Sequence, residues 1–405
     1  MLKLETDYDS LQSQLGRNLR PNAIRNLTKL LGRSDVISLA AGAPSPETFP
    51  LEELAEISAR VIRDRGQFAL QYGPTRGQGK LVEQVVQIMK ARGVENADPS
   101  EVVMTTGSQQ GLDLIARLLL DPGDVALVEL PSYIGGTIAL HNAQAELVGV
   151  RQDDAGIDIE HLRRQLRRLR VEGRKVKCLY TTPNFQNPSG VTLAGERRMQ
   201  LIDIAAEYDM LIIEDDAYYE LFFRSEARRP SPLAALDPSR VVYLSSFSKV
   251  LAPGIRCAWI QAPELLSSRI ELAKEGADLS SSVLDQAIVS EALDSGLIAS
   301  RLPALREFYE LRCHAMLDAL KLYAPAGARW TVPAGGFFIL MHVGGDVDTT
   351  DLLPQAIEEG VAYVPGQPFF VDGSGTDSLR LAFSKESPER IAQGIEKLCR
   401  AIAHN

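Results

Sequence analysis

Side chains that could bind a phosphate ester and a carbonyl group gather in one short segment, Val241–Arg256 (VVYLSSFSKVLAPGIR). A strand-like run here ends near Ser246 and Ser248, Lys249 follows at once, and Arg256 comes seven residues later. Hydroxyls, an amine and a guanidinium in such a cluster suit a phosphate ester next to a carbonyl. A lone lysine in a loop is usually only a solvated charge. The small residues that surround Lys249 favour a functional position.

A second candidate for anion binding is the segment Thr105–Gly111 (TTGSQQG), between a strand-like run and a helical pattern. Gly107, Ser108 and Gln109 would lie at the N-terminus of that helix. Free backbone N–H groups and the helix dipole attract anions there. Taken alone, Ser108 as a plain N-cap of the helix is the simpler interpretation.

Two further strand ends carry polar side chains. The apolar run in Met210–Leu221 (MLIIEDDAYYEL) ends in three consecutive acids, Glu214, Asp215 and Asp216. One of them could hold a cationic nitrogen or a metal ion if it pointed into a cleft, although a solvated strand end explains any single acid equally well. Asn187, in the turn NFQNPSG, could donate an amide hydrogen bond, and an ordinary turn is the alternative.

An alternation of strand and helix patterns in the middle of the chain would bring these segments together. Short apolar runs alternate with longer helical patterns, which predicts a mostly parallel sheet with helices on both faces. Ligands of such sheets bind at the carboxyl ends of the strands. The strand-like runs are 101–105, 125–129, 176–181, 210–214, 241–245 and 258–261, and the helical patterns are 109–120, 133–142, 159–169 and 195–208.

The pattern changes after about residue 285. Two long helical patterns, four short strands and a final amphipathic helix predict a smaller α+β domain there. The Pro-rich segment 40–50 (AAGAPSPETFP) is expected to be a loop. We therefore predict an α/β protein with an N-terminal arm (1–45) that packs with the small domain or a neighbouring subunit, a large domain (46–285) and a small C-terminal domain (286–405).

Composition excludes several classes of function. Of 405 residues, 45% are apolar and 24% charged, and the formal net charge is −10, which disfavours nucleic acid as a partner. The apolar runs are far shorter than a membrane helix requires, and the N-terminus does not resemble a secretory signal. The four cysteines form no C-x-x-C pair and the five histidines are scattered, so we expect no metal site and a reducing, cytoplasmic location.

Taken together and in this order, the segments resemble the fold-type I, class I/II pyridoxal-phosphate-dependent aminotransferases. The resemblance spans the chain from about Arg25 and rests on YGPTRG, GSQQ, NPSG, the DDAY of Asp215–Tyr218, SFSK-x-x-x-PGIR and SLRLAF. The phrases SLAAGAPSPETFP and GSQQGLDL are most similar to the branch with the 2-aminoadipate and kynurenine aminotransferases. The implied fold is a large domain with a mostly parallel seven-stranded sheet between helices, plus a smaller α+β domain.

The resemblance implies pyridoxal 5′-phosphate as the cofactor and assigns three catalytic residues. Lys249 matches the lysine that binds the cofactor aldehyde covalently, and Asp215 matches the acid that pairs with the pyridine nitrogen. Tyr133, in LPSYIGG, matches the aromatic residue that stacks on the ring. The other implied cofactor-binding residues are Asn187 and Tyr218 at the ring O3′, and Gly107, Ser108, Gln109, Ser246, Ser248 and Arg256 around the phosphate.

The resemblance also implies a substrate site and a dimer. Arg380, in SLRLAF, matches the arginine that binds the substrate α-carboxylate, with Asn187 beside it, and Gly42 lies in the loop whose backbone approaches that group. Arg25 matches a position that recognises the substrate side chain in some relatives. Tyr72, in QYGPTRG, matches the tyrosine that reaches the phosphate of the other subunit, so a homodimer with shared active sites is implied.

The implied reaction moves an amino group between an L-amino acid and a 2-oxo acid by a ping-pong mechanism, with 2-oxoglutarate and glutamate as one pair. Two alternatives stay open at this point. One is another reaction of the same cofactor at Cα or Cβ, such as a lyase, decarboxylase or oxidase reaction. The other, from a different class, is a non-catalytic effector domain of a MocR-type regulator.

Overall fold

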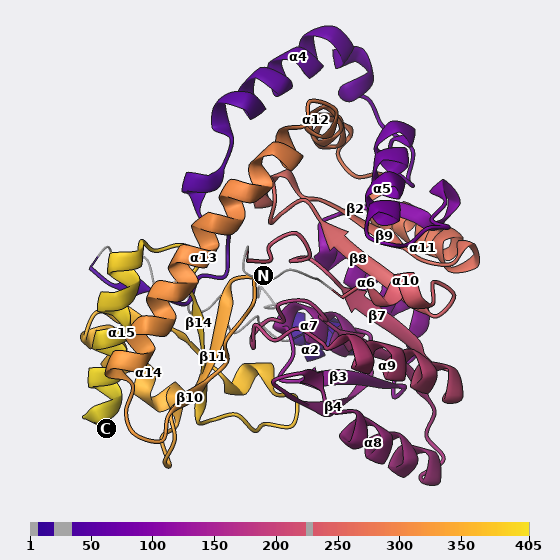
Figure 1. Ribbon diagram of the computed structural model, residues 1–405. Helices are drawn as coiled ribbons and strands as arrows, with labels where there is room; N and C mark the ends of the chain where they lie inside the picture. The colour runs from indigo at the N-terminus through magenta and orange to yellow at the C-terminus, as the bar shows by residue number, and fades with distance from the viewer. Residues whose placement is uncertain (1–6, 20–34, 224–229, 405) are drawn as a thin grey trace, which may run out of the picture.

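The computed structural model describes residues 7–19, 35–223 and 230–404. A mostly parallel sheet forms the centre of the large domain, as predicted, and Figure 1 shows helices on both of its faces. Five adjacent strands, β8, β7, β6, β3 and β4, run parallel, and β9 runs antiparallel between β8 and β2. In sheet order the seven strands are β2 (Val102–Thr106), β9 (Cys257–Gln261), β8 (Val241–Ser246), β7 (Leu211–Asp215), β6 (Val176–Thr181), β3 (Val125–Leu130) and β4 (Glu146–Asp153), and the two-residue β5 (Gly156–Ile157) extends the edge.

Alternating side chains along each strand divide the core into two layers, because successive residues of a strand point to opposite faces. On β6, Cys178 and Tyr180 join one buried cluster and Leu179 joins the other. Strands that are buried on both faces need helices over each of them. The helices between β1 and the C-terminal part are α4 (Leu51–Ala69), α5 (Gly79–Ala91), α6 (Ser108–Leu119), α7 (Ile134–Asn142), α8 (Ile159–Val171), α9 (Gly195–Glu207), α10 (Leu233–Leu236), α11 (Glu264–Asp278) and α12 (Val283–Asp294).

The C-terminal part of the chain packs an antiparallel sheet against long helices. The four-stranded sheet has the order β10-β11-β14-β13, and α13 lies beside α15 in Figure 1. Its elements are α13 (Leu297–Tyr323), β10 (Arg329–Trp330), β11 (Phe338–His342), α14 (Thr349–Glu358), β12 (Val361–Ala362), β13 (Val364–Pro365), β14 (Ser378–Ala382) and α15 (Pro388–Ala403). None of the helices in the described part of the chain is both long and apolar enough to cross a membrane.

The segment before the large domain is attached to this C-terminal part. Strand β1 (Ile37–Ser38) pairs in parallel with β12. The backbone N–H of Ala382 then donates to Leu39 O at 2.7 Å, which carries the pairing across to β14. The short helices α1 (Tyr8–Leu11) and α2 (Gln14–Asn18) precede it. The domain boundaries at residues 45 and 285 stay predictions.

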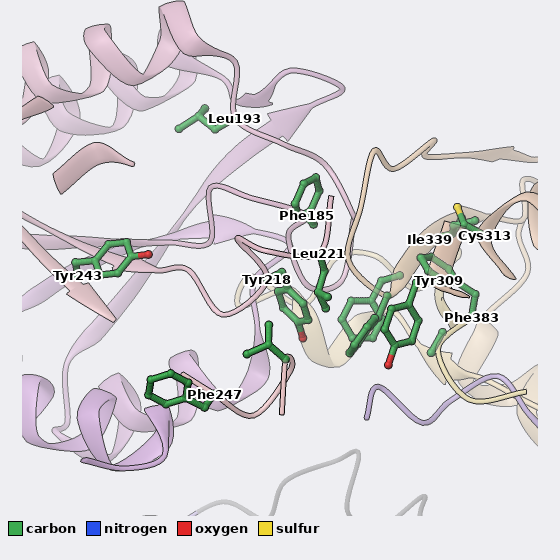
Figure 2. Packing of buried hydrophobic residues seen from close by; sticks show 14 of the residues in the cluster. Phe185, Leu193, Tyr218, Leu221, Tyr243, Phe247, Tyr309, Cys313, Ile339 and Phe383 are labelled. Atoms are coloured by element: carbon green, nitrogen blue, oxygen red, sulfur yellow. The ribbon is translucent and has the colours of Figure 1, made fainter. Parts of the chain in front are cut away.

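One continuous cluster of buried apolar side chains joins the two large parts of the molecule. Figure 2 shows this cluster with Tyr218 and Leu221, which follow β7, towards one side and Tyr309 and Ile339 of the C-terminal part towards the other. The Tyr218 ring packs edge-on against Phe337 with the ring centroids 5.4 Å apart. The core therefore passes directly behind the carboxyl ends of the central strands, where the candidate residues lie.

Candidate active site

A cavity of about 450 Å³ opens at the carboxyl ends of the parallel strands. Most of the residues singled out in the sequence line it, although they come from segments far apart in the chain. The lining residues are Ala41, Gly42, Ala43, Ser108, Gln109, Tyr133, Thr182, Asn187, Asp215, Ala217, Tyr218, Ser246, Ser248, Lys249, Arg256 and Arg380. Among the described residues, no group of three His, Cys, Asp or Glu side chains could hold a metal ion.

One side of the cavity is built to receive an anion. Helix α6 begins at Ser108, after Gly107 with φ +78°, so the first N–H groups of the helix open towards the cavity. A Cβ on Gly107 would collide with the Arg256 guanidinium, which therefore lies against this turn. The hydroxyls of Ser246 and Ser248 line the same cavity. Backbone donors, hydroxyls and a guanidinium together can bind a phosphate group.

Of the three acids at the end of β7, Asp215 faces the cavity. It is 5% exposed, and its Oδ2 accepts a hydrogen bond from the Tyr180 hydroxyl at 2.9 Å. Its Oδ1 is buried and has no hydrogen-bond partner among the described residues. Burial raises the pKa of Asp215 to about 6, although the hydrogen bond from Tyr180 and the charge of Lys249 act in the opposite direction. One carboxylate oxygen is thus left for a donor on a ligand.

The two neighbouring acids have structural partners instead. Glu214 accepts the backbone N–H groups of Leu233 and Ala234, both at 2.9 Å, and so caps α10. Asp216 accepts the Tyr243 hydroxyl at 3.0 Å. Strand alternation predicts this difference, because the residues on either side of Asp215 point to the opposite face of the sheet.

Lys249 lies in the loop after β8, and its amine borders the cavity. Burial lowers the pKa of Lys249 to about 8, partly offset by the negative charge of Asp215. The amine nitrogen is 5.7 Å from the centre of the Tyr218 ring and 5.8 Å from that of Phe337. An amine with a lowered pKa can act as a nucleophile or a base near neutral pH.

Arg380 is a cation of the four-stranded C-terminal sheet, on β14. It is 2% exposed, donates to Ala40 O at 2.7 Å and to Asn187 Oδ1 at 3.0 Å, and lies over the Phe338 ring with Cζ 4.5 Å from the ring centre. Its Nε is buried without a partner, and no carboxylate of the described residues pairs with it. Burial lowers its pKa to about 10. A buried, unpaired guanidinium favours binding of a ligand carboxylate.

Three further predicted residues border the space between these groups. Tyr133 is the N-cap residue of α7, and Asn187 and Tyr218 line the cavity next to Arg380. Burial, the largest effect, raises the pKa of Tyr218 while a hydrogen bond with Asn187 lowers it. The phenol therefore stays protonated at neutral pH and can donate.

A buried carboxylate fixes the two loops that carry Tyr133 and Asn187. Glu129, near the end of β3, accepts the backbone N–H of Thr182 at 3.0 Å and the side-chain amide of Gln186 at 3.1 Å. The Gln186 amide also donates to Pro131 O at 2.8 Å, so the loops after β3 and β6 are tied to each other. Burial raises the pKa of Glu129 to about 7, which its donors partly offset.

Two predicted residues of the described part of the chain do not line this cavity. Gly107 shapes the turn before α6 without lining it. Tyr72 is 81% exposed, so it reaches no part of the cavity of its own chain, and its role in a partner's site stays a prediction. Arg25 lies outside the described residues.

Sequence reasoning missed two residues, Tyr180 on β6 and Thr182 directly after it. Tyr180 holds Asp215, and Thr182 lines the cavity with a buried hydroxyl that makes no hydrogen bond of normal geometry with a described residue. Tyr180 is opposite Ile213 in the sheet and so lies on the same side of it as Asp215. No local sequence signal marks Tyr180, because its bond to Asp215 depends on which strand pairs with β6.

Comparison with known proteins agrees with this geometry. The family model for aminotransferase class I and II matches residues 34–398. An aromatic-amino-acid aminotransferase from Thermococcus litoralis is 39% identical over 98% of this chain and 95% of its own. The crystal structure of a kynurenine aminotransferase from Pyrococcus horikoshii, in complex with PMP, has a TM-score of 0.94 at 37% identity, covering 98% of both chains. That of an α-aminoadipate aminotransferase from Thermus thermophilus, with N-(5′-phosphopyridoxyl)-L-leucine, has a TM-score of 0.90 at 37% identity, covering 98% of this chain and 99% of its own.

The protein is thus an enzyme of the fold-type I, pyridoxal-phosphate-dependent kind. It belongs to the class I and II aminotransferase family. Its cofactor is pyridoxal 5′-phosphate, and the residues present fit that group. The free Asp215 Oδ1 suits a protonated ring nitrogen, and the turn at Gly107, where a Cβ would fill the space against Arg256, suits the phosphate.

The lowered pKa of Lys249 predicts how the cofactor-free protein captures its cofactor as pH changes. Only the neutral amine attacks an aldehyde, so the capture rate should rise roughly tenfold per pH unit and level off above about pH 8. Stopped-flow absorbance measures this rate. Nα-acetyl-lysine in solution is the control, with a midpoint near the ordinary lysine value of ~10.4. A protein midpoint as high as that of the control would contradict the lowered pKa.

The neighbouring acids provide a second test. Asp215→Asn should retain the cofactor and slow removal of the substrate Cα proton by roughly 10²-fold or more, because the ring nitrogen loses its anionic partner. Asp216→Asn should keep this rate within about tenfold but lower the free energy of unfolding by about 1–3 kcal/mol, since its bond from Tyr243 is buried. Single-turnover kinetics and denaturant titration measure the two effects. A larger kinetic loss in Asp216→Asn would show that the register is off by one.

Proposed function

We propose that this aminotransferase moves an amino group between an L-amino acid and a 2-oxo acid by a ping-pong mechanism, with 2-oxoglutarate and glutamate as one substrate pair. The observation that carries the proposal is that Lys249 and Arg380 line the same cavity. The amine is available as a base near neutral pH, and the guanidinium lacks a carboxylate partner among the described residues. Every amino acid and every 2-oxo acid has the carboxylate that Arg380 can bind.

Each residue of the cavity has a separate role in this proposal. When bound, pyridoxal phosphate supplies an electron sink for the pair released at the substrate Cα. Arg380 holds the α-carboxylate through its fork of N–H groups. This fixes the Cα near Lys249, whose Nζ takes the Cα proton as general base. Asp215 holds a proton at the ring nitrogen through its free oxygen, and Tyr133 covers the ring face.

The phosphate group is bound by Ser108, Gln109, Ser246, Ser248 and Arg256 in this proposal. Gln109 donates to Gly135 O at 2.9 Å, which fixes the first turn of α6 against α7. Asn187 and Tyr218 donate to the ring oxygen O3′, next to the substrate. These groups would hold the cofactor through both halves of the reaction.

The substrate class proposed is amino acids with large aromatic or long acidic side chains. The relatives support this class, because their names specify aromatic amino acids, kynurenine and α-aminoadipate. The loop of Ala41, Gly42 and Ala43 leaves a wall of small side chains on one side of the cavity. An acidic side chain needs a second cation, and we propose Arg25 for that role.

We also propose a homodimer in which Tyr72 completes the phosphate site of the other subunit. Its 81% exposure in the single chain leaves the phenol free to reach a neighbouring molecule. A cytoplasmic location is proposed on separate grounds, since all four cysteines are buried and unpaired, as in proteins of reducing compartments.

The half-reaction tests the proposed activity. A panel of amino acids added to the cofactor-loaded enzyme should convert the cofactor to its aminated form without any oxo acid, fastest for aromatic and aminoadipate-type substrates. Lys249→Ala should slow this conversion by roughly 10³-fold or more, because base and nucleophile are lost together. Borohydride trapping and peptide mapping should locate the cofactor on Lys249. Release of ammonia or carbon dioxide in place of the aminated cofactor would contradict the transaminase proposal. A cofactor label on Lys274 would contradict the assignment of Lys249.

Mixed dimers test the shared site. Tyr72→Phe alone should weaken phosphate binding by about tenfold, as expected for one lost hydrogen bond to a charged group. In a heterodimer of a Lys249→Ala chain and a Tyr72→Phe chain, one site carries both substitutions and the other neither. Separately tagged, co-expressed heterodimers should therefore recover close to one wild-type site per dimer. Activity no higher than half that of the Tyr72→Phe homodimer would place Tyr72 in its own chain's site.

A further inference from the structure

Tyr180 makes the two oxygens of Asp215 unequal. The Tyr180 side chain is fully buried, at 0% exposure, and its hydroxyl donates to Asp215 Oδ2 at 2.9 Å. Asp215 Oδ1 is buried without a partner among the described residues. A carboxylate held at one oxygen by a fixed donor cannot rotate freely about its terminal bond, so the direction of the other oxygen is fixed as well.

The fold holds Tyr180 in place for this bond. Strands β6 and β7 are adjacent and parallel, with Tyr180 opposite Ile213, so the tyrosine and Asp215 reach the same side of the sheet. Helix α7 packs over the ring at Gly136, where a Cβ would collide with the end of the phenol. The phenol is therefore confined between the helix and the sheet, with its hydroxyl directed at Asp215.

The hydrogen bond also bears on the charge of Asp215. Burial raises the pKa of this carboxyl, and the bond from Tyr180 is the largest effect that lowers it. Burial holds the pKa of Tyr180 itself well above that of a free phenol, so the hydroxyl stays a donor at neutral pH. Without that donor, Asp215 would attract a proton more strongly.

We propose that Tyr180 is a positioning residue for Asp215, which fixes the direction of the free carboxylate oxygen and keeps the carboxylate ionised, so that the proton stays on the cofactor ring nitrogen. The inference rests on the role of Asp215 in the proposed function. Tyr180 does not line the cavity, and in this proposal it acts through the aspartate alone.

The molecule contains a matched control for this proposal. Tyr243, on β8, is also 0% exposed and donates its hydroxyl to Asp216 Oδ2 at 3.0 Å. Tyr180→Phe and Tyr243→Phe therefore each remove a buried hydroxyl from an aspartate, and they do so from the two strands that flank β7. Only the first change affects the acid that faces the cavity. Loss of stability should be at least as large in Tyr243→Phe, because the Tyr243 hydroxyl also accepts from the buried Arg92 Nη1 at 2.6 Å, and denaturant titration measures it.

The experiment reads the ring nitrogen directly. The enzyme and both variants are loaded with pyridoxal phosphate labelled with ¹⁵N in the ring, and the ¹⁵N chemical shift is recorded. Tyr180→Phe should move the signal towards that of neutral pyridine. It should also raise the pH midpoint of the visible absorbance band by roughly one unit, because a hydrogen bond to a charged group is lost. Tyr243→Phe should leave the shift and the midpoint at the wild-type values.

Two results would overturn the proposal. One is a Tyr180→Phe enzyme with the wild-type ¹⁵N shift and absorbance midpoint. The other is an equal change in Tyr243→Phe, which would reveal a general effect of core damage. If Tyr180→Phe does not fold, 3-fluorotyrosine at position 180 replaces it, since this residue keeps the shape and donates more strongly. In that protein the cofactor ring nitrogen should stay at least as protonated as in the wild type. A ¹⁵N shift towards that of neutral pyridine would contradict the proposal.

These measurements do not depend on which substrates the enzyme accepts. They need only the bound cofactor, so a failure of the amino-acid panel leaves them intact. Turnover provides a separate check, in which Tyr180→Phe should lower kcat by roughly tenfold to a hundredfold with little change in KM, because the carboxylate site at Arg380 is untouched. If Asp215→Asn had no effect on the ring nitrogen, the role of Asp215 itself would be wrong.

Discussion

The constraint on which this structure depends is the cost of keeping an amine, a carboxylate and a guanidinium together away from water. Burial shifts the pKa of Asp215 upward and those of Lys249 and Arg380 downward, in each case towards the uncharged form. Asp215 Oδ1 and Arg380 Nε still lack partners among the described residues. The cofactor and the substrate carry the groups that satisfy them, so much of what binds here is determined by what the protein leaves unpaired.

Two parts of the molecule contribute these charged groups, and an apolar core fixes the position of one part relative to the other. Lys249 and Asp215 follow strands of the large sheet, whereas Arg380 lies on β14 of the C-terminal sheet. Aromatic contacts bridge the two parts, with the Tyr309 and Phe337 ring centres 4.6 Å apart and Tyr218 packed against Phe337. The hydrogen bond from Arg380 to Asn187 crosses the same boundary. Packing behind the cavity thus sets the distance between the two charged ends of the site.

Much of the fold and most of the cavity lining could be predicted from the sequence, because apolar strands that end in polar residues mark the edge where ligands bind. The choice of Asp215 among three acids required strand alternation together with a family motif. The edge strand β4 was missed, since exposed positions such as Glu146 and Arg151 interrupt its apolar pattern. Tyr180 was missed for another reason. Its function depends on Asp215 of the adjacent strand, and local sequence patterns do not show which strands lie next to each other.

The attachment of β1 to β12 has a consequence for the order in which the site can form. Arg380 donates to the carbonyl of Ala40, a residue 340 positions earlier in the chain, and the pairing of Ile37 with Val361 lies beside this contact. On the ribosome, the first strand has no partner until nearly the whole polypeptide has been made. The wall of the cavity is therefore among the last parts of the molecule to close, and contacts of such long sequence separation are slow to form. A truncated chain could build the large sheet and still have no place for a substrate.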